Sequence, residues 1–197
     1  MATLTKVPVD LEDRLDNEVN GGVDKMSDKD AVEVLKEEYK ILMSSTLDYT
    51  TLYQEIEKYN VSLPEEPDVV DLSDINKRYA LAQSALTRVS NIERQAIMNC
   101  GVWSKYRGRL QEYIDCKSSK LLINEDVMKL SNAALQKAEV RNRLSKTHAL
   151  MSKIVSGVEE AESFKRVVEN KKKDLASVIT NLSRQVKVLS LESNLTR

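Results

Sequence analysis

Glycine, proline and aromatic residues are scarce in this chain. Its 197 residues include five Gly, three Pro, one Phe and one Trp, and aromatic residues make up only 5%. The residues that most often interrupt helices are therefore nearly absent, while Leu, Lys, Glu, Ala and Val are abundant. With so few large rings, a core must be built mainly from aliphatic side chains. The composition predicts an all-α fold.

Cysteines and long apolar runs are also lacking. Cys100 and Cys116 are the only cysteines, too few for a disulfide framework and without the spacing of a zinc site. No apolar run approaches the roughly 20 residues that span a bilayer, and the N-terminus is acidic where a signal peptide would be basic and then apolar. We expect reduced thiols, no membrane contact and a cytoplasmic location.

Catalytic signatures are weak. The single histidine, His148, has apolar neighbours Leu144 and Met151 at helical spacing, which is typical of a helix flank. The "NGG" at 20–22 does not form a phosphate loop before a helix, and the carboxylates at 159–162 have no His or Cys nearby. We predict a non-enzymatic protein with no cofactor and no metal site.

Charge is distributed unevenly along the chain. Residues 1–75 carry 7 Lys and Arg against 19 Asp and Glu, whereas residues 76–197 carry 23 against 12. This asymmetry predicts an acidic arm and a basic body, and the body could meet phosphates, an acidic partner or the arm itself.

The first 72 residues divide into three predicted parts. Residues 1–26 are mostly acidic or polar and are expected to form a flexible acidic arm. Residues 27–60 are predicted to form an N-terminal amphipathic helix, whose heptad seam has Thr46 as its one polar member. Residues 61–72, with two prolines and four carboxylates in "NVSLPEEPDVVDL", are predicted to be a linker.

Residues 73–197 predict a long helical hairpin with helices at about 73–120 and 132–190. The seam of the first helix includes Ala82, Val89, Ala96, Trp103 and Leu110 and is interrupted at Glu93 and Arg107. Ser131 is the expected cap of the next helix. We therefore predict an elongated antiparallel helical hairpin or bundle with long coiled-coil helices.

The last helix carries the strongest seam, and Gly157 could bend it. Because one apolar seam cannot face water, it predicts pairing with the preceding helix, with another subunit, or with both, and hence a homo-oligomer. Lys165 and Lys172 fall on seam positions, which suggests a locally opened seam or an acidic partner. A β-strand at "VKVLSL" is the alternative near the C-terminus. The seam residues assigned to oligomer contacts are Met151, Ile154, Val158, Val168, Leu175, Ile179, Leu182, Val186 and Leu189.

Aromatic and basic residues occur together in "GVWSKYRGRL". Positive charge for phosphates and flat rings for bases are what a single-stranded nucleic acid requires. The competing interpretation is that Trp103 is buried, since it is in phase with the seam. The predicted nucleic-acid-binding residues are Trp103, Lys105, Tyr106, Arg107, Arg109, Arg141, Arg143, Lys146, Lys171, Lys172, Lys173 and Arg184. For each basic cluster, a solvated helix surface is the alternative.

The chain resembles the UvsY-type recombination mediators of tailed phages at two short motifs. The first is Trp103, Tyr106, Gly108 and Arg109, and the second is "LASVITNLSRQVKVL" around Asn181 and Arg184. The resemblance implies an oligomeric helical protein, phage-encoded and acting in the host cytoplasm, that binds single-stranded DNA and contacts a recombinase and a single-strand-binding protein. The acidic arm is not matched by the family pattern.

Two functions follow as hypotheses. The first is a non-enzymatic, oligomeric mediator of recombination or repair that binds single-stranded DNA through its basic body, with the acidic arm covering that surface. The alternative is a structural coiled-coil protein, such as a virion component, assembly chaperone or adaptor, whose charges only solvate its helices. Salt dependence separates them, because nucleic-acid binding releases counterions.

Overall fold

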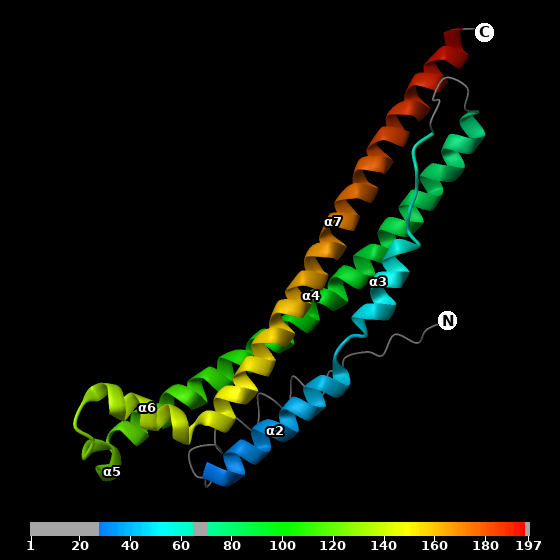
Figure 1. The fold of residues 1–197 in the computed structure, drawn as a ribbon. Coiled ribbons are helices and arrows are strands. Elements are labelled where there is room, and N and C mark those ends of the chain that lie inside the picture. The colour runs from blue at the N-terminus through cyan, green and yellow to red at the C-terminus, as the bar shows by residue number, and fades with distance from the viewer. Residues whose placement is uncertain (1–27, 65–70, 196–197) are drawn as a thin grey trace. The chain divides into compact units, whose positions relative to one another are not determined.

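The computed structural model of the chain describes residues 28–64 and 71–195. All regular secondary structure within these ranges is helical: α2 (Asp28–Ser45), α3 (Tyr49–Glu57), α4 (Leu72–Leu122), α5 (Glu125–Met128), α6 (Ala133–Arg143) and α7 (Ser145–Leu195) (Figure 1). The predicted all-α class is confirmed. The alternative strand at "VKVLSL" is wrong, because these residues lie inside α7.

The chain forms two compact units, and both long helices contribute to each. Unit 1 comprises Met1–Thr46 and Tyr106–Ile154, and unit 2 comprises Leu47–Lys105 and Val155–Arg197. The expected flexible arm at 1–26 lies outside the described residues, as do residues 65–70 of the expected linker.

The helix predicted over residues 27–60 is two helices. Thr46 donates its hydroxyl to the carbonyl of Leu42 at 2.8 Å, and α3 then starts anew with Asp48 as its N-cap. The Asp48 carboxylate accepts hydrogen bonds from the backbone N–H of Thr51 at 3.2 Å and from its hydroxyl at 2.5 Å. These short polar side chains offer the backbone an alternative to continued helix. Thr46, the one polar member of the predicted seam, marked this break.

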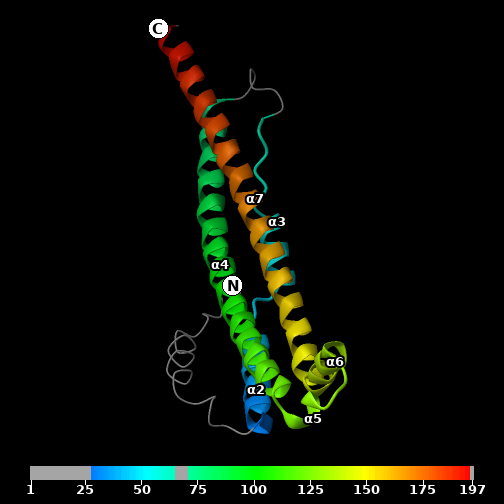
Figure 2. The same ribbon diagram turned by 90° about the vertical axis from the view of Figure 1, so that its left-hand side faces the viewer.

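In unit 2, α3, α4 and α7 pack side by side (Figures 1 and 2). At one end, Ile75 and Ala82 of α4 are buried with Leu182 of α7, and Ile179 and Val186 pack against them. Farther along, Glu93 meets Lys172 and Trp103 meets Gly157, so residue numbers rise along α4 as they fall along α7. The two helices are therefore antiparallel within this unit, as the hairpin prediction requires.

The third helix of unit 2 covers the seam with aromatic side chains. Tyr49, Leu52 and Ile56 of α3 are buried. The ring centroids of Tyr49 and Tyr53 lie 5.0 and 5.1 Å from the ring centroid of Phe164 on α7. Aromatic pairs at such distances add to the stability of a core. The Tyr49 hydroxyl accepts a hydrogen bond from the side-chain amide of Asn99, which satisfies this buried amide.

In unit 1, the turn between α4 and α7 is held by a small apolar cluster. Val127 of α5 is buried with Val140 and Leu144, and Leu121 packs against them. Asn132 caps α6 by accepting the N–H of Leu135 at 2.8 Å, so the expectation of Ser131 as the cap is off by one residue.

The helix predicted over 132–190 is divided at Leu144, where φ is −94° and ψ is 13°. Leu144 donates its N–H to Val140 as the C-cap of α6, and its carbonyl accepts the N–H of His148 in the first turn of α7. Leu144 therefore ends one helix and precedes the next.

Candidate nucleic-acid interface

Trp103 is packed inside unit 2. Its side chain is only 2% exposed, and it lies so close to Gly157 that a Cβ at that position would overlap three carbons of the indole. Gly157 does not interrupt α7, which is continuous through it. Glycine at this point provides room for the indole. The prediction that Trp103 stacks on bases is wrong, and the competing interpretation of a buried tryptophan is confirmed.

Tyr106 is buried in unit 1. Its side chain is 4% exposed, and its hydroxyl donates a hydrogen bond to the backbone carbonyl of Leu35 on α2. Burial, together with the negative charge of Glu38, raises the pKa of Tyr106 well above its usual range. This ring fastens α2 to α4 and is not available for stacking, so its predicted binding role is also wrong.

No aromatic side chain in the described ranges is exposed, and these ranges include all nine of the chain. Five of the rings are buried, and those of Tyr39, Tyr53, Tyr59 and Tyr79 are half-buried, because aromatic rings are the largest apolar groups the chain has for filling its thin cores. A nucleic acid bound to the cations would therefore meet charge without a fully exposed ring on which its bases could stack.

The cations beside Trp103 and Tyr106 are placed differently. Lys105, in unit 2, and Arg107, in unit 1, are exposed, whereas Arg109 is half-buried in unit 1. Arg107 is in phase with the predicted seam of α4, yet its side chain is exposed to solvent. It is therefore not part of the packed face of this helix.

The second basic cluster lies where α6 passes into α7 in unit 1. Arg141 and Lys146 are exposed, and Arg143 binds Glu139 on the same helix, with Nε to Oε1 at 2.8 Å. The stretch Tyr106–Ile154 of unit 1 carries 10 Lys and Arg against 5 Asp and Glu. Lys117, Lys120, Lys129 and Lys137 belong to this excess and were not singled out from the sequence, because the heptad pattern fades there.

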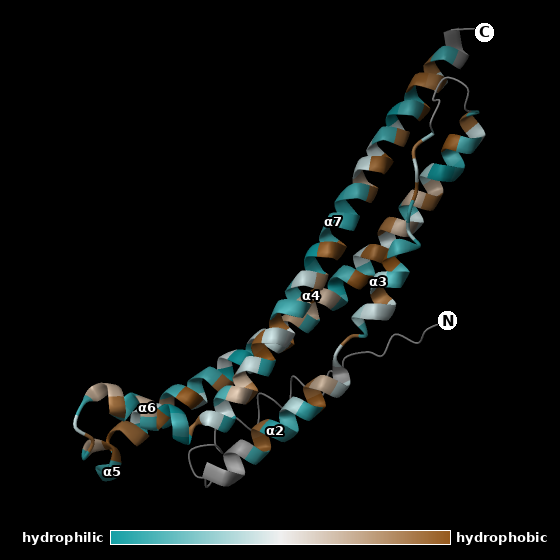
Figure 3. Ribbon diagram, in the orientation of Figure 1, coloured by the Kyte–Doolittle hydropathy of each residue, from teal (hydrophilic) through white to brown (hydrophobic). Residues whose placement is uncertain are grey.

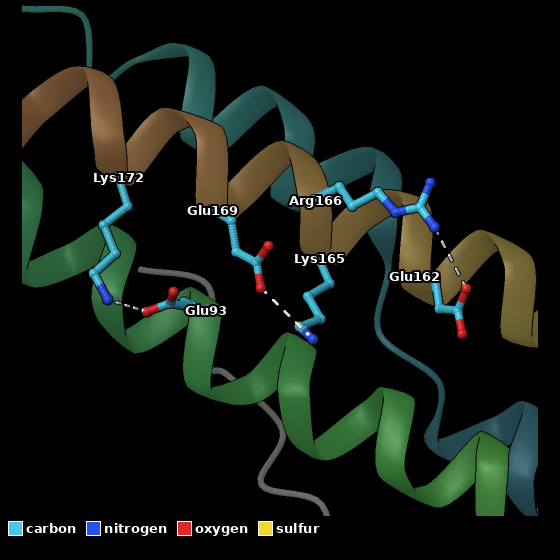
Figure 4. Close-up of polar contacts among 6 residues, drawn as sticks. All are labelled: Glu93, Glu162, Lys165, Arg166, Glu169 and Lys172. Atoms are coloured by element: carbon cyan, nitrogen blue, oxygen red, sulfur yellow. Dashed lines mark hydrogen bonds and ion pairs between the residues drawn. The ribbon is translucent and has the colours of Figure 1, made fainter.

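In unit 2 several predicted binding cations have partners within the chain. Lys172 of α7 meets Glu93 of α4, with Nζ to Oε2 at 2.5 Å (Figure 4). Lys171 donates a hydrogen bond to the side-chain carbonyl of Asn60. Lys173 and Arg184 are exposed. Glu93 is thus the acidic partner expected for the seam lysine Lys172. The sequence indicates Glu93 only as an interruption of the seam of α4.

Lys165, the second seam lysine, lines a hollow between α4 and α7. A hollow of about 420 Å³ is lined by small residues of α4, which include Cys100, Gly101 and Ser104, and by charged residues of α7. There Lys165 pairs with Glu169 at 3.6 Å and Arg166 with Glu162 at 3.8 Å (Figure 4). Burial raises the pKa of the Cys100 thiol. The charges lining the hollow are balanced by neighbours on their own helix.

The residues assigned to an oligomer seam are covered by the chain itself. Ile154 of unit 1 is fully buried, and in unit 2 Val158, Val168, Leu175 and Leu182 are at most 3% exposed. Ile179, Val186 and Leu189 pack against the cluster around Ile75, and Met151 is half-buried. The seam therefore gives no reason of its own to require a second subunit.

The described residues offer neither a metal site nor a membrane-spanning helix. Within residues 28–64 and 71–195, His, Cys, Asp and Glu side chains nowhere gather in the groups of three that could hold a metal ion. In the same ranges, every helix is too short or too polar to cross a membrane.

The fold and charge distribution define a class, an all-α protein built on an antiparallel helix pair with a basic stretch in one unit. In comparisons with known proteins, the chain matches no family model, no curated protein and no solved structure.

Proposed function

We propose that this chain is a non-enzymatic helical protein that binds single-stranded DNA in recombination or repair, through phosphates alone. The observation that carries the proposal is the excess of cations in Tyr106–Ile154, 10 against 5 acidic residues, with Arg107, Arg141 and Lys146 exposed. Neutralising phosphates with Lys and Arg releases condensed counterions, and this release supplies affinity without base contacts.

Within the described ranges no aromatic side chain is exposed, and this determines the mechanism we expect. Without stacking, each phosphate contact contributes a similar share of affinity whatever the base, so we expect little preference among base sequences. The resemblance to recombination mediators rests partly on Trp103 and Tyr106, which are core residues in this structure. It does not add contacts to DNA at those two positions.

The experiment is a salt titration of binding to a labelled oligo-dT, with a duplex of the same length in parallel. For a protein contacting several phosphates of a single strand, the logarithm of affinity should fall linearly with the logarithm of salt, with a slope of about −0.7 per contact. The double variant Arg141→Glu/Lys146→Glu should bind much more weakly. The matched control, Lys58→Glu/Lys77→Glu, changes net charge equally at exposed sites of unit 2 and should bind nearly as wild type does.

The proposal extends to the oligomeric state, the protein partners and the location of the chain. We propose a homo-oligomer that contacts a recombinase and a single-strand-binding protein in the cytoplasm of a phage-infected host. Because the predicted seam is used within the chain, an oligomer would have to use other apolar side chains, such as Leu81 and Leu191, which are 63% and 64% exposed. Mass measurement in solution, with and without Leu81→Ser/Leu191→Ser, tests this surface.

The second candidate is a structural helical protein without nucleic-acid binding. It is favoured by the ion pairs of unit 2, where Lys165, Arg166 and Lys172 each have a carboxylate partner. Under this alternative the salt titration finds no binding to either DNA, and the charge variants leave the behaviour of the protein unchanged.

A further inference from the structure

The turn between α4 and α6 presents apolar side chains to solvent. Residues 121–135 are called the tip below. Val127 is directed inward to Val140 and Leu144, but Ile123 and Met128 are 74% and 60% exposed. Ile123 is the most exposed large apolar side chain in the described ranges. Leu122 and Leu135 add to this surface at 38% and 48%.

The tip is too short to bury these groups itself. The helix α5 has only four residues, so its one inward position is filled by Val127 and its last residue, Met128, faces outward. In Figure 3 the ribbon at α5 is partly brown, the colour of hydrophobic residues. Scattered exposed apolar residues are ordinary, but four of the fourteen in the described ranges fall within 14 residues here, and such clustering indicates a contact surface.

Lysines border the same surface. Lys120 precedes Leu122, Lys129 follows Met128, and Lys137 lies two residues after Leu135. Lys129 has a carboxylate neighbour, Asp126, at 3.9 Å, with both side chains 73% exposed, so this pair is weak. An occupant that offers apolar groups together with carboxylates would match the tip on both counts.

The chain contains a segment of that composition. Residues 7–19, "VPVDLEDRLDNEV", are called the acidic segment below. In it Val7, Leu11, Leu15 and Val19 recur every four residues, and five carboxylates lie between them. If this segment were helical, these four side chains would share one face, and Pro8 would suit the first turn.

The acidic segment is tethered close to the tip. Eight residues, 20–27, lie between Val19 and Asp28, the first residue of α2, and the nine chain steps from Val19 to Asp28 span up to about 30 Å when extended. Figures 1 and 2 both show the first turn of α2 at the same end of unit 1 as α5. The tether therefore gives the segment a high effective concentration at this surface.

We propose that the acidic segment, residues 7–19, docks on the tip of its own chain. In this contact its apolar ladder covers Ile123 and Met128, and its carboxylates face Lys120, Lys129 and Lys137. Lys120, Lys129 and Lys137 also belong to the basic stretch proposed for DNA binding. The docking contact is tested without DNA, so its failure and the failure of the proposed function would be seen in different experiments.

Carbodiimide crosslinking of the full chain with peptide mass mapping tests the proposal. Amide crosslinks are expected from Asp10, Glu12, Asp13, Asp16 or Glu18 to Lys120, Lys129 or Lys137. In Ile123→Ser/Met128→Ser these crosslinks should fall by about tenfold or more, because two apolar contacts are lost. The matched control, Ile97→Ser/Met98→Ser, removes an isoleucine and a methionine of unit 2 that are 48% and 49% exposed, and it should leave these crosslinks unchanged. Unaltered circular dichroism shows that both variants are folded.

Three results would overturn the docking proposal. One is a crosslink map in which the acidic segment reaches the lysines of unit 2 as often as those of the tip. Another is an unchanged yield in Ile123→Ser/Met128→Ser. The third is a mixture of isotope-labelled and unlabelled protein in which tip crosslinks join different molecules, which would assign the surface to a second copy of the chain.

Discussion

The indole of Trp103 on α4 lies directly on Gly157 of α7, and this contact explains why the only tryptophan of the chain stands among basic residues. The ring belongs to the core of unit 2, while neighbouring Lys105 is on the outer face of the same helix. On a helix, residues two positions apart lie on nearly opposite sides, so closeness in sequence does not make a shared site.

Replacing Gly157 with alanine should destabilise the protein. The added methyl group would overlap the indole, and overpacking of this kind costs about 1 to 3 kcal/mol. Gly101→Ala and Gly108→Ala are matched controls in α4, because a Cβ at either position meets nothing within 4 Å. These two should stabilise by about 0.5 to 1 kcal/mol through helix propensity. Urea denaturation followed by circular dichroism measures all three.

A compensating change should recover part of that loss. The Nε1 of Trp103 has no hydrogen-bond partner among the described residues, so Trp103→Phe forfeits no hydrogen bond while making room for a methyl group. We expect Trp103→Phe/Gly157→Ala to be more stable than the sum of the two single effects predicts. Strict additivity would argue against direct contact.

The ion pair between Lys172 and Glu93 should be coupled in a double-mutant cycle. Glu93 is 17% and Lys172 41% exposed, so solvent screens the pair partly, and we expect about 0.5 to 1.5 kcal/mol. Exchange of the charges in Glu93→Lys/Lys172→Glu should recover most of the stability that either single reversal loses. The solvent-exposed pair Lys40 and Glu37 is the control and should show little coupling.

The fluorescence of Trp103 should not respond to DNA. Because its side chain is 2% exposed, we expect blue-shifted emission, weak quenching by acrylamide and no change on addition of oligo-dT, even at concentrations where binding is complete. Anisotropy of a labelled oligonucleotide verifies binding in the same sample. Quenching by DNA with an unchanged circular dichroism spectrum would return Trp103 to the interface.

Stability should fall at alkaline pH. Burial raises the pKa values of Tyr49 and Tyr106 above the usual value near 10, so the unfolded chain loses these protons at lower pH than the folded chain does. The stabilisation is fully present below about pH 10 and declines as pH rises beyond it. Urea denaturation between pH 8 and 11, with Tyr49→Phe and Tyr106→Phe for comparison, measures it. A free energy of unfolding that falls equally in wild type and both variants would contradict this assignment.

The heptad periodicity determined much of the fold by itself. Ala82, Val89, Ala96 and Trp103 recur every seven residues along α4, and all are buried as their spacing predicts. The helical class follows from such seams, because a long amphipathic helix must cover its apolar stripe. The antiparallel order of α4 and α7 does not follow from them. The break before Asp48 was harder to foresee, since one polar seam residue is also tolerated in unbroken helices.

Only the tertiary structure decided which surface each seam and each charge would meet. The sequence could not tell that α4, rather than a second copy, covers Leu182, because a seam specifies an apolar partner without naming it. It also could not pair Glu93 with Lys172, which are 79 residues apart and meet only when the two helices adopt one register. For the same reason, the sequence places Trp103 and Tyr106 beside basic residues, whereas the tertiary structure buries both rings in the cores.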